Sequence, residues 1–245
     1  MNSIERRQEI LKRLQTNGMV SIQSLADELQ VSSMTIRRDL NRFADQGLVR
    51  MESGGALLNS STLYEHNMTI KSGIMFDEKV RIAQKCLDFI KEGDSIFLDA
   101  GTTTGYILDY LPVHSATFVT NAVSHAKRLA AAGNRVILIG GELKGTTEAV
   151  VGSQAILAIQ SYHFTKGFFG TNGVSKRHGF TTPDPSEALV KQAAMRQTEN
   201  CYVLADSQKF GTVSSVTFAP FDGAIILTET EVPEGFAGSK NVRIV

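Results

Sequence analysis

The 245-residue chain contains no tryptophan, two cysteines, five prolines and no excess of charge of either sign. Basic and acidic side chains number 25 each, so the chain as a whole does not attract a polyanion and any attraction to nucleic acid is local. Cys86 and Cys201 lack the spacing of a metal site or a redox pair, and we expect both to be small buried side chains. We expect no metal and no cofactor.

Long hydrophobic runs are also missing. No stretch approaches the roughly 20 apolar residues of a membrane span, and the first residues lack the apolar core of a secretory signal. A hydrophobic content of 42% is typical of a globular α/β protein. We therefore expect a cytoplasmic protein with no membrane partner.

The first 58 residues carry the pattern of a winged helix-turn-helix domain. Apolar residues recur at helical spacing in three stripes, over residues 4–17, 22–29 and 33–43. Short apolar segments on either side of Gly54 and Gly55 then indicate a β-hairpin. We assign residues 1–58 to a DNA-binding domain and the polar, aperiodic residues 59–76 to a linker.

Residues 77–245 alternate apolar strands with helices. Continuous apolar segments such as 95–99, 117–120 and 135–140 are separated by helical patterns, including one over residues 78–90. Such an alternation is typical of a mostly parallel sheet covered by helices on both faces. The predicted fold class is α/β, with this sheet forming a second, effector domain.

Arg37 and Arg38 stand side by side in the third helical stripe. If the apolar residues of that stripe face the core, both arginines point outward, and Asp39, the only acid near them, lies to the side. A solvated charged face is the alternative, but the helix and tight turn that precede the stripe favour contact with DNA. The candidate DNA-binding residues are Ser32 as the helix cap, Ser33, Thr35, Arg37, Arg38, Asn41, Arg42 and, in the hairpin, Arg50.

Polar and small residues follow several strands of the second domain. Because parallel strands end at the same edge of a sheet, we expect these residues to gather there, where ligands of open α/β folds bind. The turn from Asp99 to Gly105 offers backbone N–H groups and hydroxyls that favour phosphate, although plain turns and caps are the alternative for each segment. The candidate ligand residues are Asp99, Gly101, Thr102, Thr103, Thr104, Thr120, Asn121, Gly140, Gly141, Gly170 and Asn172.

Three charged residues farther along the chain each allow two interpretations. Glu187 and Lys191 share one helix face, either as a surface ion pair or as part of the ligand site. Lys209 follows a strand, where it is either a cation for phosphate or an exposed loop lysine.

These motifs resemble those of DeoR-type bacterial transcriptional regulators. The resemblance rests on SSMTIRRDL at residues 32–40, GLVR at 47–50 and GGA at 54–56. It departs from the family at Ser53, where a histidine is usual, so a wing contact by that histidine is absent or altered. The second domain is similar to the family's effector domain, which shares its fold with ribose-phosphate isomerases. The matching positions include Glu187, Lys191 and Lys209.

The resemblance implies a repressor of a sugar uptake or catabolism operon. It would bind double-stranded operator DNA as a homodimer or homotetramer and be released by a phosphorylated sugar, with a ketose phosphate such as fructose 1-phosphate or tagatose phosphate as our preference. The alternatives are a sugar-phosphate isomerase and a DNA-binding scaffold without a ligand. Asn172 stands where we expect such an isomerase to carry an aspartate, so we predict no catalytic residue and no enzyme.

Overall fold

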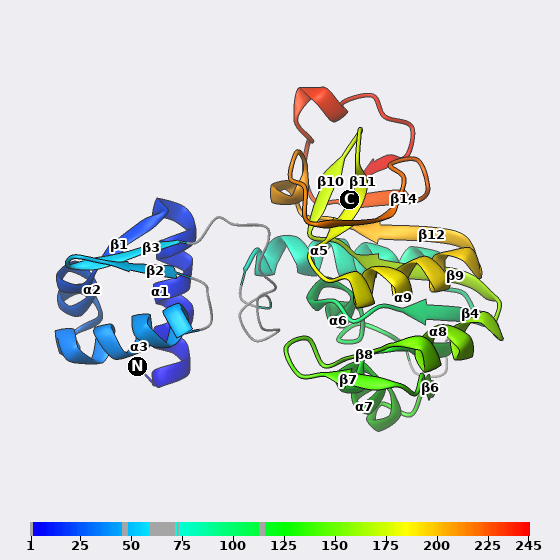
Figure 1. The fold of residues 1–245 in the computed structure, drawn as a ribbon, viewed down its shortest axis with the longest axis horizontal. Coiled ribbons are helices and arrows are strands. Elements are labelled where there is room, and N and C mark those ends of the chain that lie inside the picture. The colour runs from blue at the N-terminus through cyan, green and yellow to red at the C-terminus, as the bar shows by residue number, and fades with distance from the viewer. Residues whose placement is uncertain (1, 46–48, 59–71, 73, 113–115) are drawn as a thin grey trace. The chain divides into compact units, whose positions relative to one another are not determined.

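A computed structural model describes residues 2–45, 49–58, 72, 74–112 and 116–245. The chain divides into two compact units, Met1–Ile74 and Met75–Val245 (Figure 1). Most of the expected linker, residues 59–71 and 73, lies outside the described part of the chain. Within that part, no helix combines the length and the hydrophobicity that a membrane span requires.

The first unit packs its helices against a small antiparallel sheet. Its elements are α1 (Ser3–Asn17), β1 (Met19–Ser21), α2 (Ile22–Leu29), α3 (Ser33–Asp45), β2 (Val49–Glu52) and β3 (Gly55–Leu58). The strands pair in the order β1-β3-β2, and a single buried cluster that includes Ile10, Leu25 and Ile36 joins the helices. The prediction of a winged helix-turn-helix is confirmed.

Two glycines shape the wing of this unit. Gly54 has a φ of 87°, in the left-handed region that glycine adopts at little cost. A Cβ atom on Gly55 would collide with the carbonyl oxygen of Val20, so only glycine lets β1 pair with β3 at this point. The sequence did not predict β1, because three residues are too few to show an alternating pattern.

The second unit is built on a seven-stranded sheet. In spatial order its strands are β15 (Val242–Ile244), β14 (Ile225–Thr228), β12 (Thr198–Leu204), β9 (Phe164–Gly170), β4 (Asp94–Leu98), β5 (Ala116–Thr120) and β6 (Arg135–Leu138). Every neighbouring pair runs parallel. The predicted mostly parallel sheet is thus confirmed.

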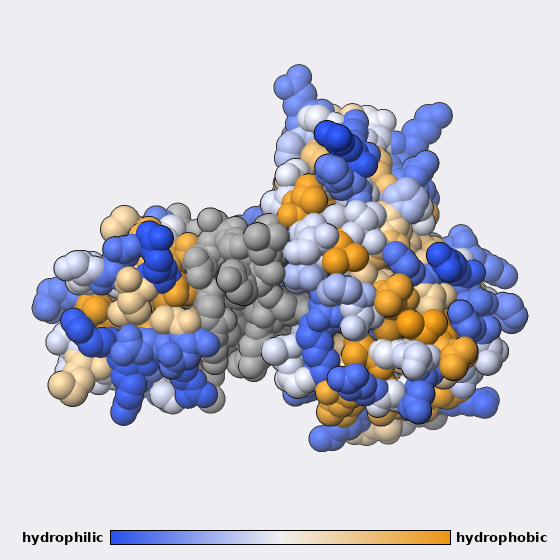
Figure 2. All heavy atoms as spheres, in the orientation of Figure 1, coloured by the Kyte–Doolittle hydropathy of each residue, from blue (hydrophilic) through white to orange (hydrophobic). Residues whose placement is uncertain are grey.

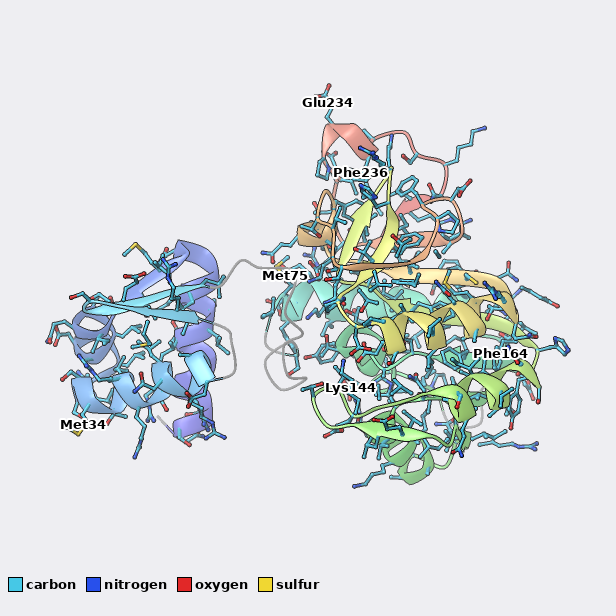
Figure 3. All side chains as sticks on the ribbon, viewed as in Figure 1. Met34, Met75, Lys144, Phe164, Glu234 and Phe236 are labelled. Carbon is cyan, nitrogen blue, oxygen red and sulfur yellow. The ribbon has the colours of Figure 1, made fainter. Side chains whose placement is uncertain are left out.

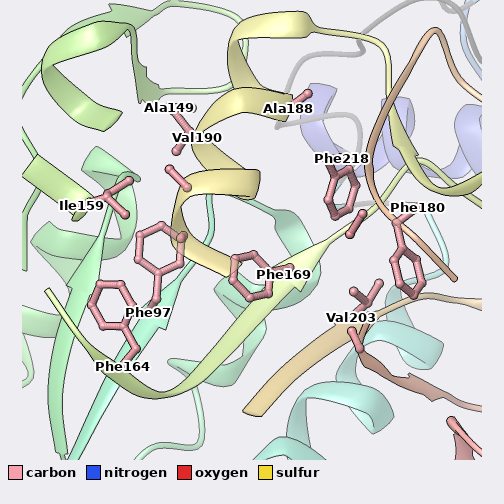
Figure 4. Close-up of a cluster of buried hydrophobic side chains, with 14 of the residues drawn as sticks. Phe97, Ala149, Ile159, Phe164, Phe169, Phe180, Ala188, Val190, Val203 and Phe218 are labelled. Carbon is pink, nitrogen blue, oxygen red and sulfur yellow. The ribbon is translucent and has the colours of Figure 1, made fainter. Parts of the chain in front are cut away.

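Helices cover both faces of this sheet. On one face lie α5 (Phe76–Cys86), α6 (Thr102–Ile107) and α7 (Val123–Ala131), and on the other lie α8 (Ser153–Gln160) and α9 (Pro185–Arg196). Successive residues of a strand belong to buried clusters on opposite faces of the sheet. Phe168 packs with the first set of helices and Phe169 with the second. Figure 4 shows the second cluster, with Phe97 and Phe169 close to Val190 of α9.

Several short elements differ from the sequence predictions. The helix expected over residues 78–90 is α5 followed by a 3-10 turn, η1 (Leu87–Phe89), and two further 3-10 turns are η2 (Ser207–Lys209) and η3 (Glu234–Phe236). Besides β1, the unpredicted strands are the edge strand β15, the hairpin of β7 (Glu142–Lys144) with β8 (Ala149–Val151), and a sheet of β10 (Gly173–Ser175), β11 (Gly179–Thr182) and β13 (Val216–Ala219). Each has three or four residues, too few for a recognisable period.

Candidate functional site

The outward face of α3 carries the side chains expected to meet DNA. Ile36, Leu40 and Phe43 are buried in the core of the first unit, whereas Arg37 and Arg38 are exposed. Of the other predicted residues on or beside this helix, Thr35 is half-buried and the exposed ones are Ser32, Ser33, Asn41 and Arg42. Figure 2 shows hydrophilic side chains along α3, at the lower edge of the first unit in this view.

Ser32 starts this helix as expected. Its Oγ accepts a hydrogen bond from the backbone N–H of Thr35 at 3.2 Å, which is the geometry of an N-cap. The hydroxyl groups of Ser32 and Thr35 also lie 2.9 Å apart. The cap fixes where α3 begins and thereby places Ser33, Arg37 and Asn41 in one row along its surface.

Asp39 lies elsewhere than the sequence suggests. It is 5% exposed, and its Oδ2 lies 2.7 Å from Nε of Arg6 in α1. Asp39 follows Ile36 by three residues and precedes Phe43 by four, so it belongs to the buried stripe. The sequence interpretation, which put Asp39 beside the exposed face of Arg37 and Arg38, is therefore wrong, because Asp39 is buried. Its charge is neutralised inside the unit, so Asp39 presents no carboxylate beside Arg37 and Arg38. The other acid of α3, Asp45, is exposed at the C-terminal end of the helix.

Arg50, expected to reach a phosphate from the wing, lies exposed on β2. Its Nη2 and Nε lie 2.8 and 2.9 Å from Oε1 of Glu52. The two side chains pair because residues two apart on a strand point to the same side. A phosphate contact by Arg50 would have to compete with this ion pair.

Sequence reasoning missed Met34. This side chain is 79% exposed, and Figure 3 shows it projecting from α3 on the outside of the first unit. Met34 precedes Arg37 by three residues and Arg38 by four, so it shares their face of the helix. An apolar residue in a helical pattern is normally assigned to the core, so the exposure of Met34 could not be predicted from the sequence.

The predicted ligand residues of the second unit follow neighbouring strands. β12, β9, β4, β5 and β6 are consecutive in the sheet, so their carboxyl ends lie along one edge. From β4 the chain proceeds outward to β5 and β6 and then returns to β9 on the other side of β4. The ends of β4 and β9 therefore flank a topological switch point, where open α/β sheets bind ligands.

Asp99 and Lys191 meet at this switch point. Both side chains are buried, and Oδ2 of Asp99 forms an ion pair with Nζ of Lys191. Asp99 also accepts a hydrogen bond from the Gly170 N–H at 3.0 Å, while Lys191 donates one to the Gly170 carbonyl at 3.0 Å. These contacts tie the ends of β4 and β9 to α9 and leave the lysine charge neutralised.

Glu187 is buried one turn away from Lys191 but pairs with a different segment. Its Oε1 lies 3.0 Å from Nζ of Lys144 and accepts a hydrogen bond from Thr147 at 2.6 Å. Lys144 also lies 2.8 Å from Asp184. The interpretation of Glu187 and Lys191 as a surface ion pair is therefore wrong. Glu187 links the β7–β8 hairpin to the first turns of α9 through Lys144 and Thr147. Lys191 links α9 to the ends of β4 and β9 through Asp99 and Gly170.

Two of the predicted threonines use their hydroxyl groups in hydrogen bonds to backbone carbonyl oxygens. The Oγ1 of Thr104 lies 2.7 and 2.8 Å from the carbonyl oxygens of Asp99 and Gly101 in its own turn. The Oγ1 of Thr120 donates to the Leu98 carbonyl of the adjacent strand at 2.6 Å. Both hydroxyls shape strand ends. Of the four threonines predicted to bind the ligand, Thr102 and Thr103 therefore remain candidates. Thr102 is half-buried and Thr103 is buried.

Close backbone approach requires glycine at one of the four predicted positions, Gly141. A Cβ on Gly101 would lie 3.1 Å from Oγ1 of Thr104 and at an ordinary contact distance, 3.6 Å, from Cα of Gly170. A Cβ on Gly170 would meet no atom closer than 3.6 Å. Gly141 has a φ of 152°, and its Cβ would lie 2.6 Å from the Val151 carbonyl oxygen. Gly140 is exposed, and a Cβ there would meet no atom within 4 Å.

Asn121 and His125 bury polar atoms that no described residue satisfies. The amide nitrogen of Asn121 donates to the Val150 carbonyl at 3.2 Å, but its Oδ1 has no partner within the described ranges. The same is true of Nδ1 of His125, a residue of α7 that is 2% exposed. A buried acceptor without a donor costs about 1–3 kcal/mol and is uncommon. These two atoms suit a ligand that brings hydroxyl donors.

His125 belongs to the surroundings of the switch point, although no motif in the sequence indicates it. Its ring forms a hydrogen bond with the Gly101 backbone and interacts with the charge of Asp99. Burial, together with the nearby charge of Arg128, lowers the pKa of His125 from 6.5 to about 4, against the opposing effect of Asp99. The imidazole is consequently neutral near pH 7 and can accept a hydrogen bond.

Asn172 and Lys209 extend the same edge past β9 and β12. The Oδ1 of Asn172 accepts a weak hydrogen bond from Thr182 at 3.4 Å. Nζ of Lys209 lies 3.8 Å from Asp206, and its side chain is 28% exposed. Lys209 thus keeps access to solvent, unlike Lys191. No group of three or more histidine, cysteine, aspartate or glutamate residues in the described part of the chain is arranged to hold a metal ion.

Known proteins match both units. The model of the DeoR-like helix-turn-helix domain matches residues 6–62, and that of the DeoR C terminal sensor domain matches residues 75–229. An uncharacterized HTH-type transcriptional regulator, FruR, of Bacillus subtilis is 41% identical over 93% of this chain and 91% of its own. The lactose phosphotransferase system repressor of Staphylococcus epidermidis is 34% identical over 86% of this chain and 85% of its own. Ribose 5-phosphate isomerase A of Methanocaldococcus jannaschii aligns with a TM-score of 0.40 and 12% identity over 56% and 55% of the two chains.

Proposed function

We infer that this chain, which belongs to the DeoR family of DNA-binding transcriptional regulators, represses genes for the uptake or breakdown of a sugar. We further infer that a phosphorylated sugar releases it from its operator. The name of the staphylococcal relative, a repressor of a sugar phosphotransferase system, supports the sugar part of the proposal. Because the family is made up of regulators, the chain is not an isomerase or another enzyme.

The observation that carries the proposal is the exposed face of α3. Arg37, Arg38 and Arg42 are exposed there, and none has a carboxylate partner among the residues that the structure describes. Guanidinium groups presented from a capped helix suit phosphates and the acceptor edges of bases. We assign Ser33, Arg37 and Asn41 to contacts with base edges in the groove. We assign Arg38, Arg42 and, in the wing, Arg50 to contacts with phosphates.

We place the sugar phosphate at the switch point of the second unit. The solvent-accessible Lys209 suits the phosphate, and Thr102 and Thr103 are the first two residues of α6, which follows β4. The unsatisfied acceptors of Asn121 and His125 suit sugar hydroxyls. A ketose phosphate, such as fructose 1-phosphate or tagatose phosphate, is the effector that we propose.

A homodimer or homotetramer is the assembly that we propose. One winged domain reaches few phosphates and bases, so its affinity alone is low. Linking two or four such domains makes each further binding event intramolecular and raises the affinity through effective concentration. Repeated half-sites in the operator are the expected counterpart. Binding to chromosomal DNA agrees with the cytoplasmic location expected from the sequence.

Selection of DNA by the full chain tests this function. Duplexes are selected from a random library, and their affinity is then measured with and without each member of a panel of pentose and hexose phosphates. We expect a defined sequence preference and a large loss of affinity with one or a few phosphorylated sugars. The corresponding sugars without phosphate are the control and should have no effect. Absence of any sequence preference, or turnover of a sugar phosphate by the chain, would contradict the proposal.

A further inference from the structure

Met34 is an apolar side chain in a surface that is otherwise polar and basic. The other large apolar residues of α3, Ile36, Leu40 and Phe43, are buried in the core. Met34 is 79% exposed and stands in the first turn of the helix, on the face of Arg37 and Arg38. The core of the first unit therefore does not require a methionine at this position.

The major groove of DNA contains one apolar group, the 5-methyl of thymine. The first residues of a recognition helix are those that contact base edges, and an unbranched thioether adapts its shape to a small apolar partner. We propose that Met34 packs against the 5-methyl group of a thymine in the operator and so selects thymine at that position. The inference rests on the DNA binding proposed for α3 and adds the base that it reads.

The charges around Met34 distinguish this partner from a protein surface. Arg37 and Arg38 follow Met34 within one turn, and both are exposed and without a carboxylate partner in the described chain. A partner that covers all three side chains must therefore offer anionic groups beside an apolar one. DNA satisfies both requirements at once, because phosphates flank the groove in which the thymine methyl lies.

Replacement of thymine by uracil tests the contact, since it removes only the methyl group. Each thymine of a duplex selected by the wild-type chain is changed singly to uracil, and the affinities of the full-length wild type and of Met34→Ala, Met34→Leu and Met19→Ala are measured. Wild type should lose about fourfold at one position per half-site, the value for one buried methyl group. Met34→Ala should bind the thymine duplex more weakly and show no uracil effect at that position.

The controls separate this contact from general effects. Met34→Leu, which keeps an apolar side chain, should retain the uracil effect. Met19 is 60% exposed on β1, across the unit from α3 in Figure 1, and Met19→Ala should behave as wild type. The inference is overturned if the selected duplex holds no thymine in the half-site, or if Met34→Ala keeps the wild-type uracil profile. A wild-type chain that selects no DNA sequence overturns the proposed function as well.

Discussion

The arginines of the first unit differ in what their guanidinium groups face. Arg6, Arg13 and Arg50 each lie beside a carboxylate of the same unit. Arg37 and Arg38 do not, within the residues that the structure describes, and both are exposed. Because exposed ion pairs contribute at most about 1 kcal/mol, leaving these two cations unpaired costs the fold little and keeps them available for a polyanion.

Replacing Arg37 or Arg38 by alanine should weaken DNA binding. A lost phosphate contact lowers the slope of log affinity against log salt by about one, and a lost base contact costs about 1–3 kcal/mol and relaxes the preference at one position. Affinity titrations over a range of salt concentrations distinguish the two. Arg81→Ala, which removes an exposed arginine of α5 in the second unit, is the matched control. An unchanged affinity and slope in both α3 variants would remove these arginines from the interface.

His125 makes the stability of the second unit depend on pH. Its pKa is lowered to about 4 in the folded state, from 6.5. The unfolded chain therefore binds the proton first, and stability is complete above about pH 6.5 and falls as the pH falls toward 4, by up to about 3 kcal/mol. Denaturant unfolding of the full chain at pH 7.5 and pH 5 should show this loss.

The His125→Gln variant isolates that contribution. Glutamine does not titrate, so the difference in unfolding free energy between wild type and variant should shrink by about 2 kcal/mol from pH 7.5 to pH 5. The other four histidines of the chain remain in both proteins and cancel in this comparison. A difference that is independent of pH would mean that His125 is not buried in its neutral form.

At the scale of elements, the Arg6–Asp39 pair joins α1 to α3. Removing one partner of a buried ion pair leaves an uncompensated charge, so Asp39→Leu should destabilise the first unit by about 3–5 kcal/mol. The double variant Arg6→Met with Asp39→Leu replaces both charges by apolar groups and should recover most of that loss. Unfolding monitored by circular dichroism measures both. If the double variant were as unstable as the single one, the pair would not act as a unit.

The elements that could be predicted are those with a clear period. The stripe of Ile36, Leu40 and Phe43 defines α3, and the continuous apolar segments of β4, β5 and β9 define a parallel sheet. The short strands β7, β8 and β10 could not be predicted, because their pairing depends on partners rather than on a pattern of their own. The strand β1 depends in addition on the missing side chain of Gly55.

The candidate ligand site could be predicted only as a set of strand ends. Sequence order places residues after β4, β5 and β9, and the parallel sheet brings those ends to one edge. Which polar atoms are already satisfied depends on contacts between distant segments, such as Asp99 with Lys191 and Glu187 with Lys144. No local pattern distinguishes the hydroxyl of Thr104, which binds its own turn, from that of Thr103.

At the scale of the whole molecule, the proposed regulation requires that a ligand of the second unit changes the affinity of the first for DNA. A sugar phosphate achieves this only if it binds better to the state of the protein that binds DNA poorly. The coupling must then be reciprocal: the factor by which the sugar phosphate weakens DNA binding equals the factor by which DNA weakens sugar-phosphate binding. A ligand that merely competes for Arg37 and Arg38 would not need the switch point at all.

The most direct test is a double titration of the full chain with its selected duplex and the releasing sugar phosphate. We expect the two factors to be equal for wild type. We also expect Lys209→Ala, which removes the proposed phosphate cation, to bind the duplex with wild-type affinity, and the sugar phosphate to leave that affinity unchanged. If the sugar phosphate released Lys209→Ala from the duplex as well as it releases wild type, or if a saturating duplex did not weaken sugar-phosphate binding, regulation through the switch point would be wrong.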